Sequence, residues 1–135
     1  MGSGEIKLED VIDNLKFSTV AKSPIHGHGL FASAPLSAGT VLGNLDGQVV
    51  PWDLHKKYEL TLEWNALDEK TLLVRAYRTK YSFINHCREP NLFLARDPLR
   101  VVVQKDTAIG EELTLDYRLE PLPPEYVNGV GRSYL

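Results

Sequence analysis

The sequence predicts a mainly β domain with little helix. Short segments rich in branched and aromatic residues alternate with glycine and proline along most of the chain, a pattern typical of strands separated by turns. Residues 58–64 alternate strictly between apolar and polar side chains, as in a strand with one buried face. Turn signals recur at Asp46-Gly47, Asp97-Pro98 and Ile109-Gly110. Many short strands with little helix indicate a β fold in which segments distant in sequence pair with one another.

Helix is predicted in two places. Residues 5–15 carry apolar side chains at helical spacing and predict a short amphipathic helix that depends on tertiary contacts. Residues 52–57 are polar and predict a single helical turn. The proline-rich tail, residues 121–135, predicts irregular chain.

The strands are expected between these segments. They cover residues 17–23, 30–34, 39–45, 48–52, 58–64, 71–77, 91–96, 99–105 and 111–117. Asp46-Gly47 is a strong hairpin signal between the third and the fourth of them. A loop that holds Asn65 and Asp68 leads from the fifth strand to the sixth, and we expect these two strands to pair.

The composition indicates one ordinary soluble domain. The chain has 135 residues, of which 43% are hydrophobic and 24% charged. No apolar run approaches the roughly 20 residues of a membrane span, and no signal-peptide pattern is present, so we expect a cytoplasmic protein, or a nuclear one in a eukaryote. The single cysteine excludes an internal disulfide framework and a cysteine zinc cluster. The net charge of −3 argues against direct nucleic-acid binding and suits a basic peptide as partner.

Residues 26–29, His-Gly-His-Gly, form the first segment whose chemistry suggests a site. Glycines let a ligand approach the main chain closely. A Gly-X-Gly alone is most simply a tight turn. His26 and His28 are candidate metal ligands, but the sequence places no third ligand near them, so we interpret them as loop residues and expect no metal site.

Residues 83–91, Phe-Ile-Asn-His-Cys-Arg-Glu-Pro-Asn, form the second segment. Asn85 and His86 can both donate and accept hydrogen bonds. Cys87 beside His86 suggests a thiol nucleophile, but neighbours on an extended chain point to opposite faces, and no third group is marked to orient the histidine. A buried structural cysteine and a turn at Pro90 are the simpler interpretations.

Residues 110–117, Gly-Glu-Glu-Leu-Thr-Leu-Asp-Tyr, form the third segment. They predict a turn that enters an amphipathic strand, with Leu113, Leu115 and Tyr117 on one face. Taken alone, Tyr117 is a core residue with its hydroxyl at the rim.

The order and spacing of these three segments resemble the SET domain, the fold of many protein-lysine methyltransferases. Residues 26–31 look like its Gly-X-Gly motif, and residues 83–91 look like its signature Phe-Ile-Asn-His-Ser-Cys-X-Pro-Asn. Residues 112–117 look like its last motif, which ends in the catalytic tyrosine. The small size and the absence of zinc-binding cysteine flanks resemble stand-alone bacterial or viral members.

The resemblance covers residues 17–120, with flanks at residues 1–16 and 121–135. It implies a β-clip of short sheets in which a C-terminal segment threads under a loop as a pseudoknot. C-terminal flanks in this family fold over the cofactor, and Tyr126 or Tyr134 could then supply a stacking surface. The tail could instead complete a peptide groove in a homodimer.

The resemblance implies an S-adenosylmethionine-dependent protein-lysine N-methyltransferase, whose substrate is a protein or peptide lysine such as one in a basic tail. The backbone around Gly27, His28 and Gly29 would contact the methionine part of the cofactor. Asn85 and His86 would hold the cofactor largely through main-chain groups that reach the adenine.

Tyr117 would be the catalytic residue, placed beside the cofactor with its hydroxyl near the transferred methyl. Leu45 stands where the family commonly has a channel tyrosine, and Leu115 stands where an aromatic residue is common. Both leucines would therefore line a wider lysine channel, and Tyr81 is a further candidate for its wall.

Three alternatives stay open. A SET-fold binding module would hold cofactor or peptide with little or no methyl transfer, and Leu45 and Leu115 favour it. A thiol-dependent enzyme would use Cys87 and His86. A structural β protein would use none of these side chains chemically.

Overall fold

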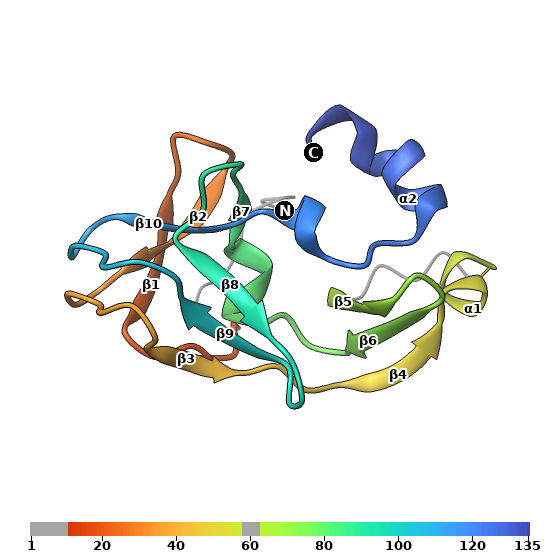
Figure 1. Ribbon diagram of the computed structural model, residues 1–135, viewed down its shortest axis with the longest axis horizontal. Coiled ribbons are helices and arrows are strands. Elements are labelled where there is room, and N and C mark those ends of the chain that lie inside the picture. The colour runs from red at the N-terminus through yellow and green to blue at the C-terminus, as the bar shows by residue number, and fades with distance from the viewer. Residues whose placement is uncertain (1–10, 58–62) are drawn as a thin grey trace, which may run out of the picture.

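The computed structural model describes residues 11–57 and 63–135, whose strands form three small sheets (Figure 1). The first sheet has the order β1 (Ser18–Lys22), β2 (His28–Ala32), β10 (Glu112–Leu115), β7 (Asn85–His86). The second has the order β3 (Val41–Asn44), β9 (Arg100–Val103), β8 (Leu92–Ala95). The third has the order β4 (Gln48–Pro51), β6 (Thr71–Arg75), β5 (Glu63–Asp68).

Helix is scarce in the described residues. They contain α1 (Trp52–Lys57), α2 (Pro124–Asn128) and 3₁₀ turns at Lys80–Phe83, Tyr117–Leu119 and Val130–Ser133. The predicted mainly β class and the predicted helical turn at residues 52–57 are therefore confirmed. No helix in the described ranges is long and apolar enough to cross a membrane.

The main hydrophobic core is built from the first two sheets. Leu30 of β2 and Leu113 of β10 have no exposed surface, and burial of each such side chain stabilises the fold by about 1.5–3 kcal/mol. A smaller apolar cluster joins the third sheet to α1 and to the C-terminal tail. The tail and α2 lie above this third sheet in Figure 1.

Strand β10 holds the C-terminal part of the chain between two earlier segments. Its first half pairs antiparallel with β2, where Leu113 lies opposite Leu30. Its second half pairs in parallel with β7, where Leu115 lies opposite His86. The strand of the third motif therefore lies between the strands of the first and the second motif in one sheet.

Asn91 provides a side-chain brace for β10. Its buried amide donates to the Glu112 carbonyl at 2.8 Å and accepts from the Thr114 backbone N–H at 2.8 Å. One side chain therefore satisfies two backbone groups of the strand, which would be costly if they were buried without partners.

The hairpin predicted at Asp46-Gly47 is wrong. Strand β3 pairs with β9 and β4 pairs with β6, so the chain leaves one sheet for another at this point. Gly47 has φ +150°, and a Cβ at this position would lie 2.5 Å from the Val74 carbonyl oxygen. The glycine allows a close backbone approach and does not form a two-residue turn.

The loop predicted to hold Asn65 is also wrong, because Asn65 lies inside β5 opposite Leu73. Its side-chain oxygen accepts a hydrogen bond from Arg75, so the buried amide has a partner that the local sequence does not reveal. The predicted pairing of the fifth strand with the sixth is confirmed for residues 63–64, and residues 58–62 lie outside the described residues.

Two predictions at the ends of the chain need correction. Residues 11–15 of the expected helix form no helix, and Ile12 instead makes a β-bridge with Thr79; residues 5–10 lie outside the described residues. The tail is not irregular, because α2 begins at Pro124, whose ring suits the first position of a helix. By contrast, the turn predicted at Asp97-Pro98 is confirmed, and the strands on either side of it, β8 and β9, pair with each other.

Candidate functional site

Two cavities meet at Tyr117. The aromatic cavity has a volume of about 230 Å³ and is lined by Glu63, Trp64, Asn65, Ala66, Tyr81, Ser82, Tyr117, Glu120, Leu122, Tyr126 and Tyr134. The histidine cavity has a volume of about 540 Å³ and is lined by Ile25, His26, Ser82, Ile84, Asn85, His86, Tyr117, Ser133 and Tyr134. Tyr117, Ser82 and Tyr134 line both, so a ligand in either cavity lies beside the same tyrosine.

Tyr117 is held by the second motif. Its backbone N–H donates to Nδ1 of His86 at 3.1 Å, and its hydroxyl donates to the Ile84 carbonyl. The rings of Tyr117 and His86 lie with their centroids 5.5 Å apart. Burial raises the pKa of Tyr117 well above its ordinary value, so the phenol is neutral near pH 7 and acts as a hydrogen-bond donor.

The charge of Asp116 is balanced by Arg118. The carboxylate accepts from Nε of Arg118 at 2.9 Å and from its Nη2 at 2.6 Å, and these hydrogen bonds lower the pKa of Asp116. Asp116 also lies 3.8 Å from Nδ1 of His86 and favours the imidazolium. Burial outweighs this and lowers the pKa of His86, so the ring is neutral near pH 7.

His86 therefore offers one free donor. Because Nδ1 accepts from Tyr117, the ring proton lies on Nε2. Nε2 is buried and has no hydrogen-bond partner within the described part of the chain. A buried donor on the wall of a cavity suits an acceptor on a bound ligand.

The side chain of Asn85 joins the second motif to the first. Its Nδ2 lies 3.3 Å from the His26 carbonyl, 3.2 Å from the His28 carbonyl and 2.9 Å from Oε2 of Glu112. A Cβ on Gly29 would collide with the Glu112 carboxylate, so the glycine makes room for this contact. Asn85 thus fixes the Gly-X-Gly turn against β10.

The structure brings three of the six predicted cofactor residues together in one cavity. Asn85, His86 and Tyr117 line the histidine cavity, and His26 does so from the Gly-X-Gly turn. Gly27, His28 and Gly29 are not among the residues that line this cavity, so the structure does not bring these three predicted cofactor residues to it.

The predicted channel residues separate into two groups. Tyr81 is buried and lines the aromatic cavity, and burial raises its pKa. Leu45 and Leu115 are 5% and 2% exposed, belong to the main core and line neither cavity. The structure therefore does not bring these two leucines to the aromatic cavity.

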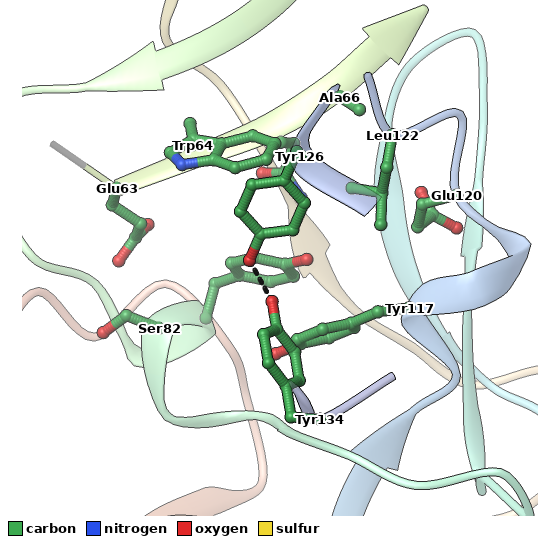
Figure 2. A pocket seen from close by; sticks show the side chains of 11 residues that line it. Glu63, Trp64, Ala66, Ser82, Tyr117, Glu120, Leu122, Tyr126 and Tyr134 are labelled. Carbon is green, nitrogen blue, oxygen red and sulfur yellow. Dashed lines mark hydrogen bonds between the residues drawn. The ribbon is translucent and has the colours of Figure 1, made fainter. Parts of the chain in front are cut away.

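The wall of the aromatic cavity combines Trp64, whose role the sequence did not indicate, with Tyr126 and Tyr134, which were expected only as a stacking surface over the cofactor. Trp64 of β5 and Tyr126 of α2 meet edge to face with ring centroids 5.1 Å apart, and both point into the aromatic cavity (Figure 2). The hydroxyls of Tyr126 and Tyr134 contact each other across it (Figure 2). Trp64 was recognised only as part of a strand face, and no local signal marks it as a site residue.

Metal and thiol chemistry find no support in this geometry. No group of three or more His, Cys, Asp or Glu side chains in the described ranges is placed to hold a metal ion. Cys87 is half-buried, and its sulfur lies 3.6 Å from the Glu89 carbonyl. Nδ1 of His86 is committed to Tyr117 and does not activate this thiol.

Most of the chain is similar to one protein family. The family model of the SET domain matches residues 27–118. The histone-lysine N-methyltransferase trithorax of Drosophila melanogaster is 28% identical over an alignment of 138 residues, which covers 86% of this chain and 4% of that protein. The H3 lysine-4 specific histone-lysine N-methyltransferases of Yarrowia lipolytica and Mycosarcoma maydis are 30% and 31% identical, over 74% and 78% of this chain. The chain spans only 10% and 8% of the length of these two relatives.

Proposed function

The chain belongs to the SET domain family, and we propose that it is a protein-lysine N-methyltransferase that uses S-adenosylmethionine. The observation that carries the proposal is the position of Tyr117. The tyrosine of the last family motif lies where two cavities of different character meet. Cofactor and lysine would enter from opposite sides and meet beside its hydroxyl.

The histidine cavity suits the cofactor. Its volume of about 540 Å³ lies within the range of small-molecule sites. Its wall offers the Nε2–H of His86, which has no hydrogen-bond partner among the described residues, and the Tyr134 ring lies 6.3 Å from the His86 ring. When bound there, S-adenosylmethionine would supply an electrophilic methyl group on a sulfonium.

The aromatic cavity suits the side chain of lysine. Five aromatic side chains and Leu122 line it, so the four-carbon stem would be buried against apolar surface. An amine with a reference pKa near 10.4 needs roughly 4–5 kcal/mol to be neutral at pH 7 in water. A desolvated cavity lowers that pKa because burial disfavours the charged form.

Tyr117 contributes by positioning the reacting groups and does not take the lysine proton. Its raised pKa makes it a poor general base at pH 7. The phenol, fixed by Ile84 and His86, shapes the junction of the two cavities and holds the reacting atoms in line. The proton of the lysine leaves to water before the amine attacks.

The alternative is a SET-fold binding module with little or no methyl transfer. Leu45 and Leu115 favour it, because they occupy positions where the family commonly has aromatic residues and they pack in the core. A module of this kind would bind lysine or cofactor and would be indifferent to the Tyr117 hydroxyl.

Two measurements test the proposal. Calorimetric titration with S-adenosylmethionine should give saturable one-site binding that Asn85→Ala and His86→Ala weaken. Core histones are the first acceptor to try with radiolabelled cofactor, because the similar proteins are named for histone lysines. Transfer that Tyr117→Phe lowers supports the enzyme. Binding without transfer, unchanged in Tyr117→Phe, supports the binding module.

A further inference from the structure

A buried arginine lies behind the wall of the aromatic cavity. Arg75 of β6 donates from Nε to Oε2 of Glu63 at 2.5 Å and from Nη2 to Oδ1 of Asn65 at 2.5 Å. Its Nη1 donates to the Asp46 carbonyl at 2.9 Å, and its guanidinium lies 5.4 Å from the centre of the Tyr81 ring. Glu63, Asn65 and Tyr81 all line the cavity, so Arg75 contacts the wall from outside at three places.

The pair of Arg75 and Glu63 is almost completely removed from water. Their side chains are 5% and 6% exposed. Glu63 also accepts from the Thr79 backbone N–H at 2.8 Å and from the Thr79 hydroxyl at 2.6 Å. The carboxylate that faces the cavity is therefore neutralised and fully hydrogen-bonded, as a buried charge requires.

Within residues 11–57 and 63–135, the other charged groups around the cavity are paired. Glu120 lies 2.8 Å from Nη2 of Arg96. Burial raises the pKa values of Tyr81, Tyr117 and Tyr134, which are neutral near pH 7. Beyond Tyr117, Asp116 is paired with Arg118, and burial keeps His86 neutral. Of the two described carboxylates that line the cavity, Glu63 is less exposed than Glu120, at 6% against 13%.

A free carboxylate in this place would oppose methyl transfer. An opposite charge within about 4–6 Å favours the charged form of a titratable group. A bare Glu63 would hold a lysine in the cavity as an ammonium ion, which has no lone pair to attack with. Each unit by which the pKa of the bound amine rises lowers its neutral fraction about tenfold.

We propose that Arg75 is a positioning residue that neutralises Glu63, so that the aromatic cavity binds the lysine side chain as a neutral amine. This inference rests on the proposed function for its role in catalysis. It also makes a claim about amine binding that can be measured without methyl transfer.

The test is binding of n-butylamine, a mimic of the lysine side chain, measured by calorimetry between pH 7 and pH 10. The wild type should bind more tightly as the pH rises, because it takes the neutral form. Arg75→Met should bind at least tenfold more tightly than the wild type at pH 7, because the bare carboxylate attracts the ammonium. Glu63→Gln should bind no more tightly than the wild type at pH 7, because the unpaired guanidinium repels the ammonium and the wild type already takes the neutral amine.

Two further variants sharpen the comparison. The double variant Arg75→Met with Glu63→Gln removes both charges and should regain the pH dependence of the wild type. Lys105→Met removes one positive charge from an exposed loop and should leave binding unchanged. If Arg75→Met does not fold, the wild type still decides the question, because an affinity that does not rise from pH 7 to pH 10 would mean that the cavity takes the ammonium.

The proposal is overturned if Arg75→Met has the same pH dependence as the wild type, and also if no variant binds n-butylamine. In a methylation assay on core histones, the acid limb of the rate should move to higher pH in Arg75→Met and to lower pH in Glu63→Gln. If the wild type transfers no methyl but the n-butylamine pattern holds, the proposed function fails while the charge assignment of the cavity stands.

Discussion

The backbone N–H of Tyr117 donates to Nδ1 of His86 over 3.1 Å, and this bond joins the last motif of the chain to the second. The parallel pairing of β7 with β10 brings the two residues together. Because Nδ1 must be unprotonated to accept, the position of Tyr117 depends on the charge of His86. The bond is therefore a direct link between pH and the geometry of the site.

Acidification should destabilise the protein through its buried histidines. Burial lowers the pKa values of His55 and His86 below the ordinary value of 6.5, so the unfolded chain binds more protons than the folded protein below pH 6.5. The free energy of unfolding should then fall as the pH drops from about 7 through the lowered pKa values. Urea unfolding at pH 8, 7, 6 and 5 measures this fall.

The contribution of His86 can be isolated by substitution. His86→Gln should lose less stability on acidification than the wild type, and His55→Phe should lose less as well. The wild type and the variants contain the same carboxylates, including Glu120, whose pKa is raised by burial. The contribution of these carboxylates to the pH dependence of the unfolding free energy therefore cancels when variant and wild type are compared. If His86→Gln and the wild type lose the same free energy, His86 is not neutral in the folded protein.

Gly29→Ala should weaken both the fold and cofactor binding. The new methyl group would lie against the Glu112 carboxylate, 2.9 Å from its Cδ and 3.0 Å from Cβ of Ser23. Glu112 is held by Ser23 and Asn85, so it cannot move without breaking hydrogen bonds, and we expect a loss of about 1–3 kcal/mol. Urea unfolding and titration with S-adenosylmethionine measure the two effects.

A double-mutant cycle with Glu112→Ala checks the cause. In the Glu112→Ala background the collision is gone, so adding Gly29→Ala should cost far less than it does in the wild type. An equal cost in both backgrounds would mean that the effect comes from the backbone and not from the carboxylate.

Asn91→Ala should destabilise the fold by about 2–4 kcal/mol. The substitution leaves the Glu112 carbonyl and the Thr114 N–H without their partner, and each unsatisfied buried group costs about 1–3 kcal/mol. Asn91→Asp should be destabilising too, because a carboxylate can accept from Thr114 but cannot donate to Glu112. Chemical denaturation compares both with Asn128→Ala in α2, which should stay within about 0.5 kcal/mol of the wild type.

Tyr134→Ala should lower the affinity for S-adenosylmethionine about tenfold. The ring lines both cavities and lies 6.3 Å from the His86 ring and 6.4 Å from the Tyr117 ring, and each aromatic contact is worth about 0.5–1.5 kcal/mol. Tyr134→Phe keeps the ring and loses only the contact with the Tyr126 hydroxyl, so its affinity should stay close to the wild type. Calorimetry separates the two variants, and an unchanged affinity in Tyr134→Ala would place the cofactor away from the tail.

Much of the histidine cavity was predictable because its residues occur in short ordered motifs. Asn85, His86 and Tyr117 stood out by type and spacing, and the structure places all three on one wall. The side chain of Asn85 was harder to interpret, since its partners are carbonyls of the first motif and the carboxylate of Glu112. Such partners depend on sheet pairing, which a local pattern does not specify.

The aromatic cavity was predictable only in part. Tyr81 and Tyr117 were candidates for the lysine channel, and Tyr126 and Tyr134 for a stacking surface, but no local pattern indicated that they share a cavity with Trp64. Trp64, Tyr126 and Tyr134 meet because the tail packs on the third sheet, and no local spacing relates them. Leu45 and Leu115 were expected in the lysine channel because the family commonly has aromatic residues at these positions. In the structure both pack in the main core, where burial of their apolar side chains is favourable.

The sequence by itself determined the β class, the order of the three motifs and the choice of Tyr117 as the candidate catalytic residue. Alternation, turn residues and motif spacing are local properties that can be read directly from the sequence. Only the tertiary structure decided that the chain passes from one sheet to another at Asp46-Gly47. It also decided which residues line the aromatic cavity and that Arg75 forms an ion pair with Glu63. Those features arise from contacts between segments far apart in the chain. Their free energy comes from burial and from hydrogen bonds formed across sheets, so it exists only once the whole chain has folded.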